Sequence, residues 1–235
     1  MKKMAIFVEG LTELKFIDRL LREIITERHL QIAHARASGG ARGSRRVMSI
    51  SAISEAHEER KYYFLIVDSS SDNRVGSDIR ENYDSMAAQG YASIIGLRDV
   101  RPDFSFAEIP KLRGRLSYRL KTKPIQVIFA LGVMEIEAWF LAEHSHFSRI
   151  HPEITPYRIK EELDFDPISG DMQLRENPAK DLSDSYALEG LAYAKRTAQI
   201  QRTIDALDYA AIYCEHPKKF PDADNIIRTL EAFIT

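Results

Sequence analysis

Short apolar segments alternate with segments of helical periodicity along the first 140 residues, and this alternation restricts the fold more than any other feature of the sequence. The clearest apolar segment is Tyr62–Val67, which is rich in aromatic and β-branched residues. A strand that is apolar on both faces is typical of the interior of a parallel sheet covered by helices. The alternation therefore predicts an α/β fold with a mainly parallel, doubly wound sheet flanked by helices.

The other elements up to residue 141 are assigned by length and periodicity. Apolar side chains recur at helical spacing from Leu14 to Ile24, and Val47, Ile50 and Ile53 share such a spacing further along the chain. We expect helices there and over 47–60, 76–89, part of 105–121 and from residue 134 onward. We expect further strands over 4–8, 30–35, 91–97 and 126–131.

The chain changes character after residue 149. Three prolines and the acidic run Glu161–Asp166 indicate a loop-rich segment, and helical patterns follow near 183–210 and 222–234. We therefore predict an α/β domain over residues 1–149 and a helical C-terminal region over residues 150–235 that packs on it.

Composition excludes several classes of protein. The 33 basic and 35 acidic residues give a net charge of −2, so a nucleic-acid partner would have to meet a local basic patch. The single cysteine, Cys214, excludes an internal disulfide and a zinc site built from cysteines. The apolar N-terminal stretch is too short for a signal peptide, and no apolar run approaches the ~20 residues of a membrane span. We expect a cytoplasmic protein without a membrane partner.

Acidic residues follow the predicted strands closely, at the end of the sheet where folds of this type bind ligands. Carboxylates that are brought together repel one another, and a divalent cation such as Mg²⁺ or Mn²⁺ relieves that repulsion. Two such ions can also stabilise the attacking and leaving oxygens of a phosphodiester displacement. The pattern predicts a metal-dependent phosphoryl-transfer site, whereas helix caps or solvated loops would be the ordinary explanation for any single acid. The candidates are Glu9, Glu13, Asp68, Asp72, Asp99, Glu135 and Glu137.

Two basic segments accompany these acids. Residues 35–46 contain three glycines and four arginines, and residues 111–123 contain six basic residues and no acid. Guanidinium groups bind phosphate oxygens well, so we expect these segments to contact a nucleic-acid backbone, with a solvated surface as the alternative. Lys195 and Arg196 are further basic residues that could reach the site. The nucleic-acid-binding candidates are Arg36, Arg42, Arg45, Arg46, Arg113, Arg115 and Lys180.

The segment that runs from the first strand through Glu9-Gly-Leu-Thr-Glu13 into a helix resembles the opening motif of the Rossmann-like TOPRIM domain of topoisomerases, primases and OLD-family nucleases. Residues 130–139, which contain Glu-Ala-Trp139, are similar to a segment of small TOPRIM-like proteins, and 177–180 and 193–195 look like weaker later motifs. The resemblance implies that Glu9 is a metal ligand or a general base.

The same resemblance implies a metal-binding Asp-x-Asp motif after the strand 62–67. This chain has Asp68-Ser-Ser70 instead, so either Asp72 or Asp99 would replace the second acid. Glu13, Glu135 and Glu137 would complete the site.

The resemblance implies a magnesium-dependent nuclease that cleaves DNA or RNA and is the toxic effector of an anti-phage defence system. An ABC- or SMC-like ATPase would then be the partner that keeps it silent. The missing second acid favours an alternative, a catalytically degenerate TOPRIM-like subunit that only binds this ATPase. A nucleotidyl or phosphate-monoester enzyme on the same fold is a third hypothesis, which would not need the basic segments. Exposed edge strands would allow a homodimer.

Overall fold

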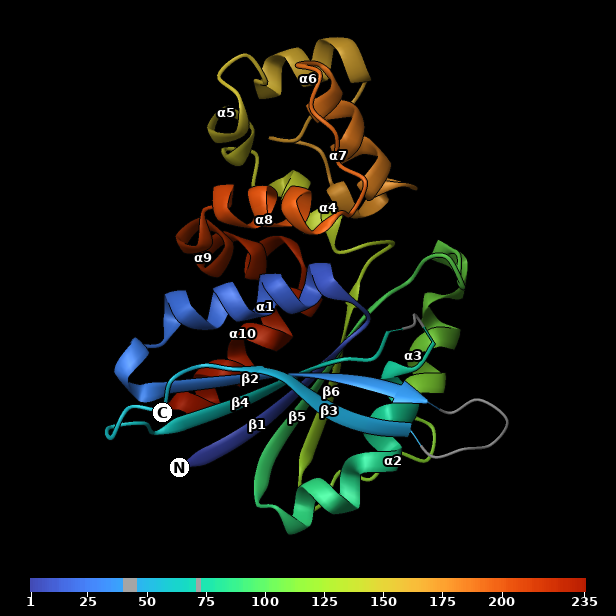
Figure 1. The fold of residues 1–235 in the computed structure, drawn as a ribbon. Coiled ribbons are helices and arrows are strands. Elements are labelled where there is room, and N and C mark those ends of the chain that lie inside the picture. The colour runs from blue at the N-terminus through green and yellow to red at the C-terminus, as the bar shows by residue number, and fades with distance from the viewer. Residues whose placement is uncertain (40–45, 71–72) are drawn as a thin grey trace.

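The computed structural model describes residues 1–39, 46–70 and 73–235. Its centre is a six-stranded mixed sheet with the strand order β3-β2-β4-β1-β5-β6 (Figure 1). All neighbouring strands run parallel except β3, which is antiparallel to β2. This confirms the predicted α/β class and the mainly parallel sheet. The strands are β1 (Lys2–Val8), β2 (Leu30–Gly39), β3 (Arg46–Ile53), β4 (Tyr62–Asp68), β5 (Tyr91–Asp99) and β6 (Gln126–Gly132).

Helices cover both faces of the sheet, and the alternation of side chains along β1 shows how. Met4 and Ile6 belong to the hydrophobic cluster of α1 and α10, whereas Ala5 and Phe7 belong to the cluster of α2 on the opposite face. Both faces of the central strands are therefore buried, as a parallel sheet requires. The helices are α1 (Leu11–Ile24), α2 (Val75–Ala88), α3 (Ile109–Ser117), α4 (Glu137–Ala142), α5 (His146–Ile150), α6 (Pro156–Leu163), α7 (Pro178–Ala187), α8 (Thr197–Ala206), α9 (Tyr209–Lys219) and α10 (Pro221–Ile234).

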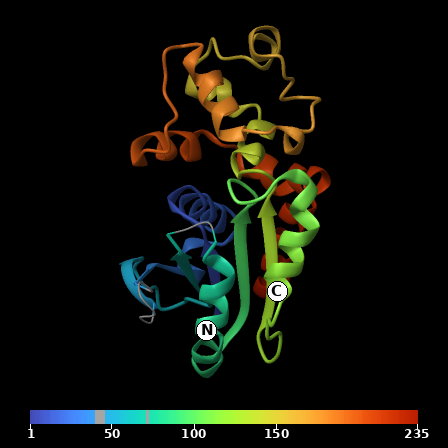
Figure 2. The ribbon, with the colours of Figure 1, turned by 90° about the vertical axis from the view of Figure 1, so that its right-hand side faces the viewer.

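The C-terminal residues contact the sheet through α10. Phe233 packs edge-on against Phe64 of β4, with ring centroids 5.3 Å apart. The cluster that contains both rings continues to Trp139, Tyr186 and Ile200, so hydrophobic contacts cross the predicted boundary at residue 149. Figure 2 shows the carboxyl ends of β5 and β6 pointing toward the C-terminal helices, drawn in yellow to orange. None of the helices in the described ranges is both long and apolar enough to cross a bilayer.

Two predicted helices differ from the structure. Residues 46–53 form β3 instead of the start of a helix, and a register shift in the pairing of β2 with β3 places two residues of β3 opposite one of β2 near Ser51. Such a bulge interrupts the two-residue period of a strand, so Ile50 and Ile53 lie on the same face three residues apart, whereas Val47, which pairs with Ser38, lies on the opposite face. Both faces of β3 are largely exposed, so apolar and polar residues need not alternate along it. The predicted helix near 183–210 is divided because Gly190 and Lys195 adopt positive φ angles of 66° and 51°, which end α7 and precede α8.

Candidate active site

Three adjacent strands bring acidic residues to one end of the sheet. Glu9 follows β1, Asp99 ends β5, and Glu135 lies in the turn between β6 and α4. Because β1, β5 and β6 are neighbours and parallel, their carboxyl ends meet. A cavity of about 320 Å³ lies at this point, and its lining residues include all three acids together with Glu13 and Lys195.

The turn from β1 into α1 places the first two acids of the cavity. The backbone N–H of Gly10 donates to Oε2 of Glu13 at 3.0 Å, which satisfies one of the free N–H groups at the start of α1. A carboxylate in the first turn of a helix also interacts favourably with the helix dipole. Glu9 and Glu13 therefore face the cavity for a local structural reason, and both are at most 8% exposed.

Asp99 and Glu137 are two further buried acids of the site. Asp99 is 5% exposed, and its Oδ1 accepts a hydrogen bond from the backbone N–H of Ile136 at 2.9 Å. Glu137 is fully buried at the start of α4 and accepts a hydrogen bond from the hydroxyl of Tyr193 at 2.8 Å. Burial of a charge without partners is costly, and these bonds offset part of that cost.

Lys195 enters the site from the C-terminal region. Its Nζ lies 3.0 Å from Oε1 of Glu137 and 3.9 Å from Oε1 of Glu135. Oε2 of Glu135 also accepts a hydrogen bond from the backbone N–H of Ala179, at the start of α7. The left-handed backbone of Lys195 costs about 1–2 kcal/mol for a residue with a side chain, and such conformations concentrate at functional sites.

A second cation reaches the site from β5. Nε of Arg98 lies 3.4 Å from Oε1 of Glu9, and the same guanidinium donates to Asp103 at 2.8 Å. Arg98 is 5% exposed. Arg101 also lines the cavity, so three cations, Lys195, Arg98 and Arg101, stand against five carboxylates, which leaves the site with an excess of negative charge.

That excess raises the affinity of the carboxylates for protons. Burial, followed by the charge of Glu137, raises the pKa of Glu13 from an ordinary value of 4.5 to about 7. Burial, followed by the charges of Glu13, Glu9 and Glu137, holds the pKa of Asp99 well above its usual range. Burial lowers the pKa of Lys195, but the surrounding acids outweigh it and keep this pKa above the ordinary value. The raised pKa values favour protonated carboxyl groups at Glu13 and Asp99, and these protons offset part of the excess negative charge.

The donor set suits a hard divalent cation. Among the residues that the structure describes, no three His, Cys, Asp or Glu side chains are arranged so that they could hold a metal ion together. Mg²⁺, however, usually binds only one or two carboxylates and completes its shell with water and phosphate oxygens. Glu9 and Asp99 line a cavity with room for water, so these two residues would hold the ion. This arrangement suits one bound ion better than two.

Asp68 stands apart from this group. Asp68 ends β4, on the other side of β1, and does not line the cavity. Its Oδ1 accepts from the backbone N–H of Ser70 at 2.7 Å, and Nε of Arg36 lies 3.9 Å from its Oδ2. Asp72 lies outside the described residues. Of the two candidates for the second acid, the structure thus brings Asp99 into the cavity.

Several of the predicted nucleic-acid-binding residues are engaged in ion pairs. Nε of Arg46 lies 2.8 Å from the fully buried Asp78, and its guanidinium also donates to three backbone carbonyls, so its role is structural. Arg113 forms a two-pronged pair with Asp222 at 2.7 and 3.1 Å. Lys180 pairs with Asp184, and the guanidinium of Arg115 lies over the ring of Phe104. Arg36 keeps a side chain that is 67% exposed, whereas Arg42 and Arg45 lie outside the described residues.

Sequence reasoning missed two contributors to the site. Arg98 directly precedes Asp99 at the end of a predicted strand, and this position could have identified it as a residue of the site. Tyr193 stands in the segment that resembles a later TOPRIM motif, and nothing local indicates that its hydroxyl binds Glu137.

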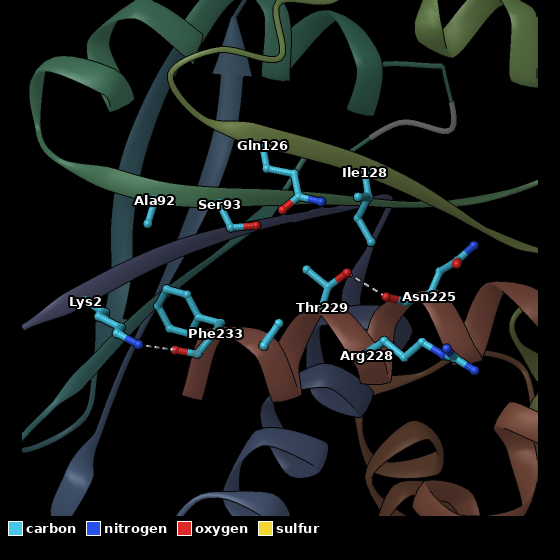
Figure 3. Close-up of a pocket in the computed structure, with 10 residues that line it drawn as sticks. Lys2, Ala92, Ser93, Gln126, Ile128, Asn225, Arg228, Thr229 and Phe233 are labelled. Carbon is cyan, nitrogen blue, oxygen red and sulfur yellow. Dashed lines mark hydrogen bonds between the residues drawn. The ribbon is translucent and has the colours of Figure 1, made fainter. Parts of the chain in front are cut away.

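A second cavity, of about 560 Å³, lies near the amino ends of the strands, between the sheet and α10 (Figure 3). Its polar lining residues are Lys2, Ser93, Gln126, Asn225, Arg228 and Thr229. No carboxylate lines it, so it lacks the groups that a divalent cation needs. The acidic cavity is the better candidate for catalysis.

No protein-family model, no curated protein and no solved structure matches this chain. The acidic cavity and the motif resemblance are therefore the features that indicate a function.

Proposed function

We propose that this protein is a TOPRIM-like nuclease that uses Mg²⁺ or Mn²⁺ to cleave phosphodiester bonds in DNA or RNA. The observation that carries the proposal is the convergence of four carboxylates in one cavity, those of Glu9, Glu13, Asp99 and Glu135, against the two cations that line it, Lys195 and Arg101. A divalent cation would neutralise this excess and provide positive charge for a phosphate group.

The residues of the site divide the chemistry between them. Glu9 and Asp99 hold the cation, and the resemblance to TOPRIM domains adds Asp68 on the far side of β1. Glu13, whose pKa is about 7, can accept a proton from the attacking water near neutral pH. Lys195, held by Glu137 and Glu135, faces the cavity and can stabilise negative charge that develops on the phosphate oxygens.

The cellular role follows from the same resemblance. We propose a cytoplasmic effector of anti-phage defence whose activity is controlled by an ABC- or SMC-like ATPase. Exposed arginines near the site, such as Arg36, would contact the nucleic-acid backbone.

One observation favours the alternative of a degenerate subunit that binds the ATPase without catalysis. The ammonium group of Lys195 already neutralises Glu137, and no three acids of the described residues converge as metal ligands. In that case the cavity would be a structural charge cluster and would bind no divalent cation.

The test combines cleavage with metal binding. The purified chain is incubated with plasmid DNA or with total tRNA, in Mg²⁺, Mn²⁺ or EDTA, and Mg²⁺ and Mn²⁺ binding is measured by calorimetry. We expect metal-dependent cleavage that Glu9→Gln and Asp99→Asn abolish, because each removes a ligand charge. Asp84→Asn, at an exposed position of α2, is the matched control and should cleave as the wild type does.

The outcomes separate the hypotheses. If the chain shows no cleavage and binds no metal, the degenerate subunit is supported. Metal binding without cleavage indicates that the ATPase partner is needed. Loss of cleavage in Asp68→Asn as well would extend the metal site across β1 to the end of β4.

A further inference from the structure

A third cavity, of about 570 Å³, borders the acidic cavity at the turn that follows β5. Arg101 and Pro102 line both cavities, so the two meet at this turn. The apolar side chains that line the third cavity include those of Phe104, Phe106 and Met134. A ligand bound at the acidic residues can therefore extend into this space, which we call the Phe106 cavity.

Phe106 presents an aromatic ring on a segment that is held in place. It is 37% exposed, whereas every other phenylalanine, all of them within the described ranges, is buried or half-buried. Oε2 of Glu108 accepts hydrogen bonds from the backbone N–H and the hydroxyl of Ser105, both at 3.2 Å, which caps this short helical turn. The backbone N–H of Phe104 donates to the carbonyl of Val100 at 3.0 Å. An exposed ring on a fixed segment loses little conformational entropy when a ligand stacks on it.

Arg101 lies between the two cavities as a cation without a charged partner. It forms no ion pair with any residue that the structure describes, whereas Arg98 and Lys195 both pair with acids of the site. Its Nη1 donates to the backbone carbonyl of Glu176, which positions the guanidinium without neutralising it. Guanidinium groups bind phosphate oxygens through directed hydrogen bonds. Arg101 is therefore placed to bind a phosphate group at the mouth of the acidic cavity.

The Phe106 cavity suits a nucleobase better than a second phosphate group. Three acids line it, and two of them are neutralised: Asp103 pairs with Arg98 at 2.8 Å, and Glu108 pairs with Lys111 at 2.9 Å. The exposed ring of Phe106 offers a surface on which any base can stack. A base reaches such a surface only when it has left the stack and the pairing of a duplex.

Resting on the proposed nuclease activity, we propose that the Phe106 cavity binds the base of the nucleotide next to the scissile phosphate, and that Arg101 binds the phosphate group itself. Phosphate and base are adjacent in a nucleotide, as Arg101 and Phe106 are adjacent along the path from one cavity to the other. The substrate is therefore a single strand or an unpaired loop, because a duplex keeps its bases inside the helix.

Fluorescence anisotropy tests the proposal with the full chain and a labelled strand of about 20 nucleotides, alone or annealed to its complement. A DNA strand and an RNA strand of the same sequence are compared. The titrations are made in Ca²⁺, another hard cation that carboxylates hold, and repeated in EDTA. We expect at least one of the two single strands to bind about tenfold or more tightly than its duplex.

Two substitutions of Phe106 test stacking. Phe106→Ala should weaken binding of the single strand about 5- to 150-fold, the usual effect of removing a side chain that stacks on a base. Phe106→Trp should retain tight binding, because an indole ring also stacks. Tyr157→Ala is the matched control and should bind as the wild type does, because Tyr157 is a 69% exposed aromatic residue that lines neither cavity.

Substitutions of Arg101 test the phosphate contact. Arg101→Gln should weaken binding of the single strand and reduce its salt dependence, because one phosphate contact is lost. Arg101→Lys keeps the charge and should retain the salt dependence. Arg28→Gln, at a side chain that is 63% exposed and lines neither cavity, should change neither quantity. Circular dichroism confirms that each variant is folded.

The outcomes distinguish the base site from the nuclease activity. Duplexes bound as tightly as single strands, or a Phe106→Ala chain that binds as the wild type does, would overturn the base site even if the chain cleaves DNA. A chain that binds no nucleic acid would overturn it as well. Absence of cleavage and of Mg²⁺ binding would instead refute the nuclease activity, and single-strand binding that depends on Phe106 and Arg101 would still support the base site.

Discussion

The buried carboxyl group of Glu13 should make the protein less stable as pH rises. Its pKa is about 7 in the folded protein, compared with 4.5 for an exposed glutamate. The protonated form stabilises the fold fully below pH 4.5, and this contribution is lost as pH rises through 7. At about 1.4 kcal/mol for each pH unit, the difference between 4.5 and about 7 amounts to about 3 kcal/mol.

The variant Glu13→Gln isolates this contribution. It removes the ionisable group and keeps an oxygen that can accept the hydrogen bond from Gly10. We expect equal stability of variant and wild type near pH 4.5, and an advantage for the variant of up to about 3 kcal/mol at pH 8. Urea unfolding in EDTA measures this difference, and the fluorescence of the single tryptophan, Trp139, reports unfolding because its side chain is buried.

Two comparisons sharpen this measurement. Glu23→Gln, at an exposed position of the same helix, should follow the pH profile of the wild type. Added Mg²⁺ at pH 8 should stabilise the wild type more than Glu13→Gln, because a bound cation relieves the repulsion that the variant lacks. Parallel stability profiles for wild type and Glu13→Gln from pH 5 to pH 8 would refute the reasoning.

Two further predictions concern positions around the sheet. Arg46→Ala should lower the free energy of unfolding by about 3–5 kcal/mol in urea titrations, because it leaves the fully buried Asp78 without its charged partner. Arg36→Ala, at an exposed side chain, should change the free energy of unfolding by less than about 0.5 kcal/mol. A similar effect of the two substitutions would contradict the structural role of Arg46. Gly132→Ala should weaken metal binding measured by calorimetry, because the added Cβ would lie 2.3 Å from Oδ1 of Asp99 and displace that carboxylate. Unchanged binding would argue against Asp99 as a ligand.

The main strands could be predicted from the sequence because local composition determines them. β4 is apolar on both faces, and the expected strands over 91–97 and 126–131 correspond to β5 and β6. β3 could not be predicted in this way. Its bulge places Ile50 and Ile53 on one face at a spacing of three, and its exposed faces do not require apolar and polar residues to alternate. Only pairing with β2 makes the segment a strand.

The acids at the strand ends could likewise be found in the sequence, but not the group that they form. Strand order decides which ends meet, and in this sheet β1 lies between β4 and β5 although β4 and β5 follow each other along the chain. As a result, Asp99 lines the cavity with Glu9, whereas Asp68 lies on the other side of β1.

The sequence by itself determined the α/β class, the principal strands and the presence of carboxylates where β1, β4, β5 and β6 end, because these features depend on residues close together in the chain. The tertiary structure decided which carboxylates share a cavity and which cations oppose them. Lys195 is 58 residues from Glu137, yet their charged groups are 3.0 Å apart. Such contacts depend on the packing of the C-terminal helices against the sheet, and no local pattern specifies them.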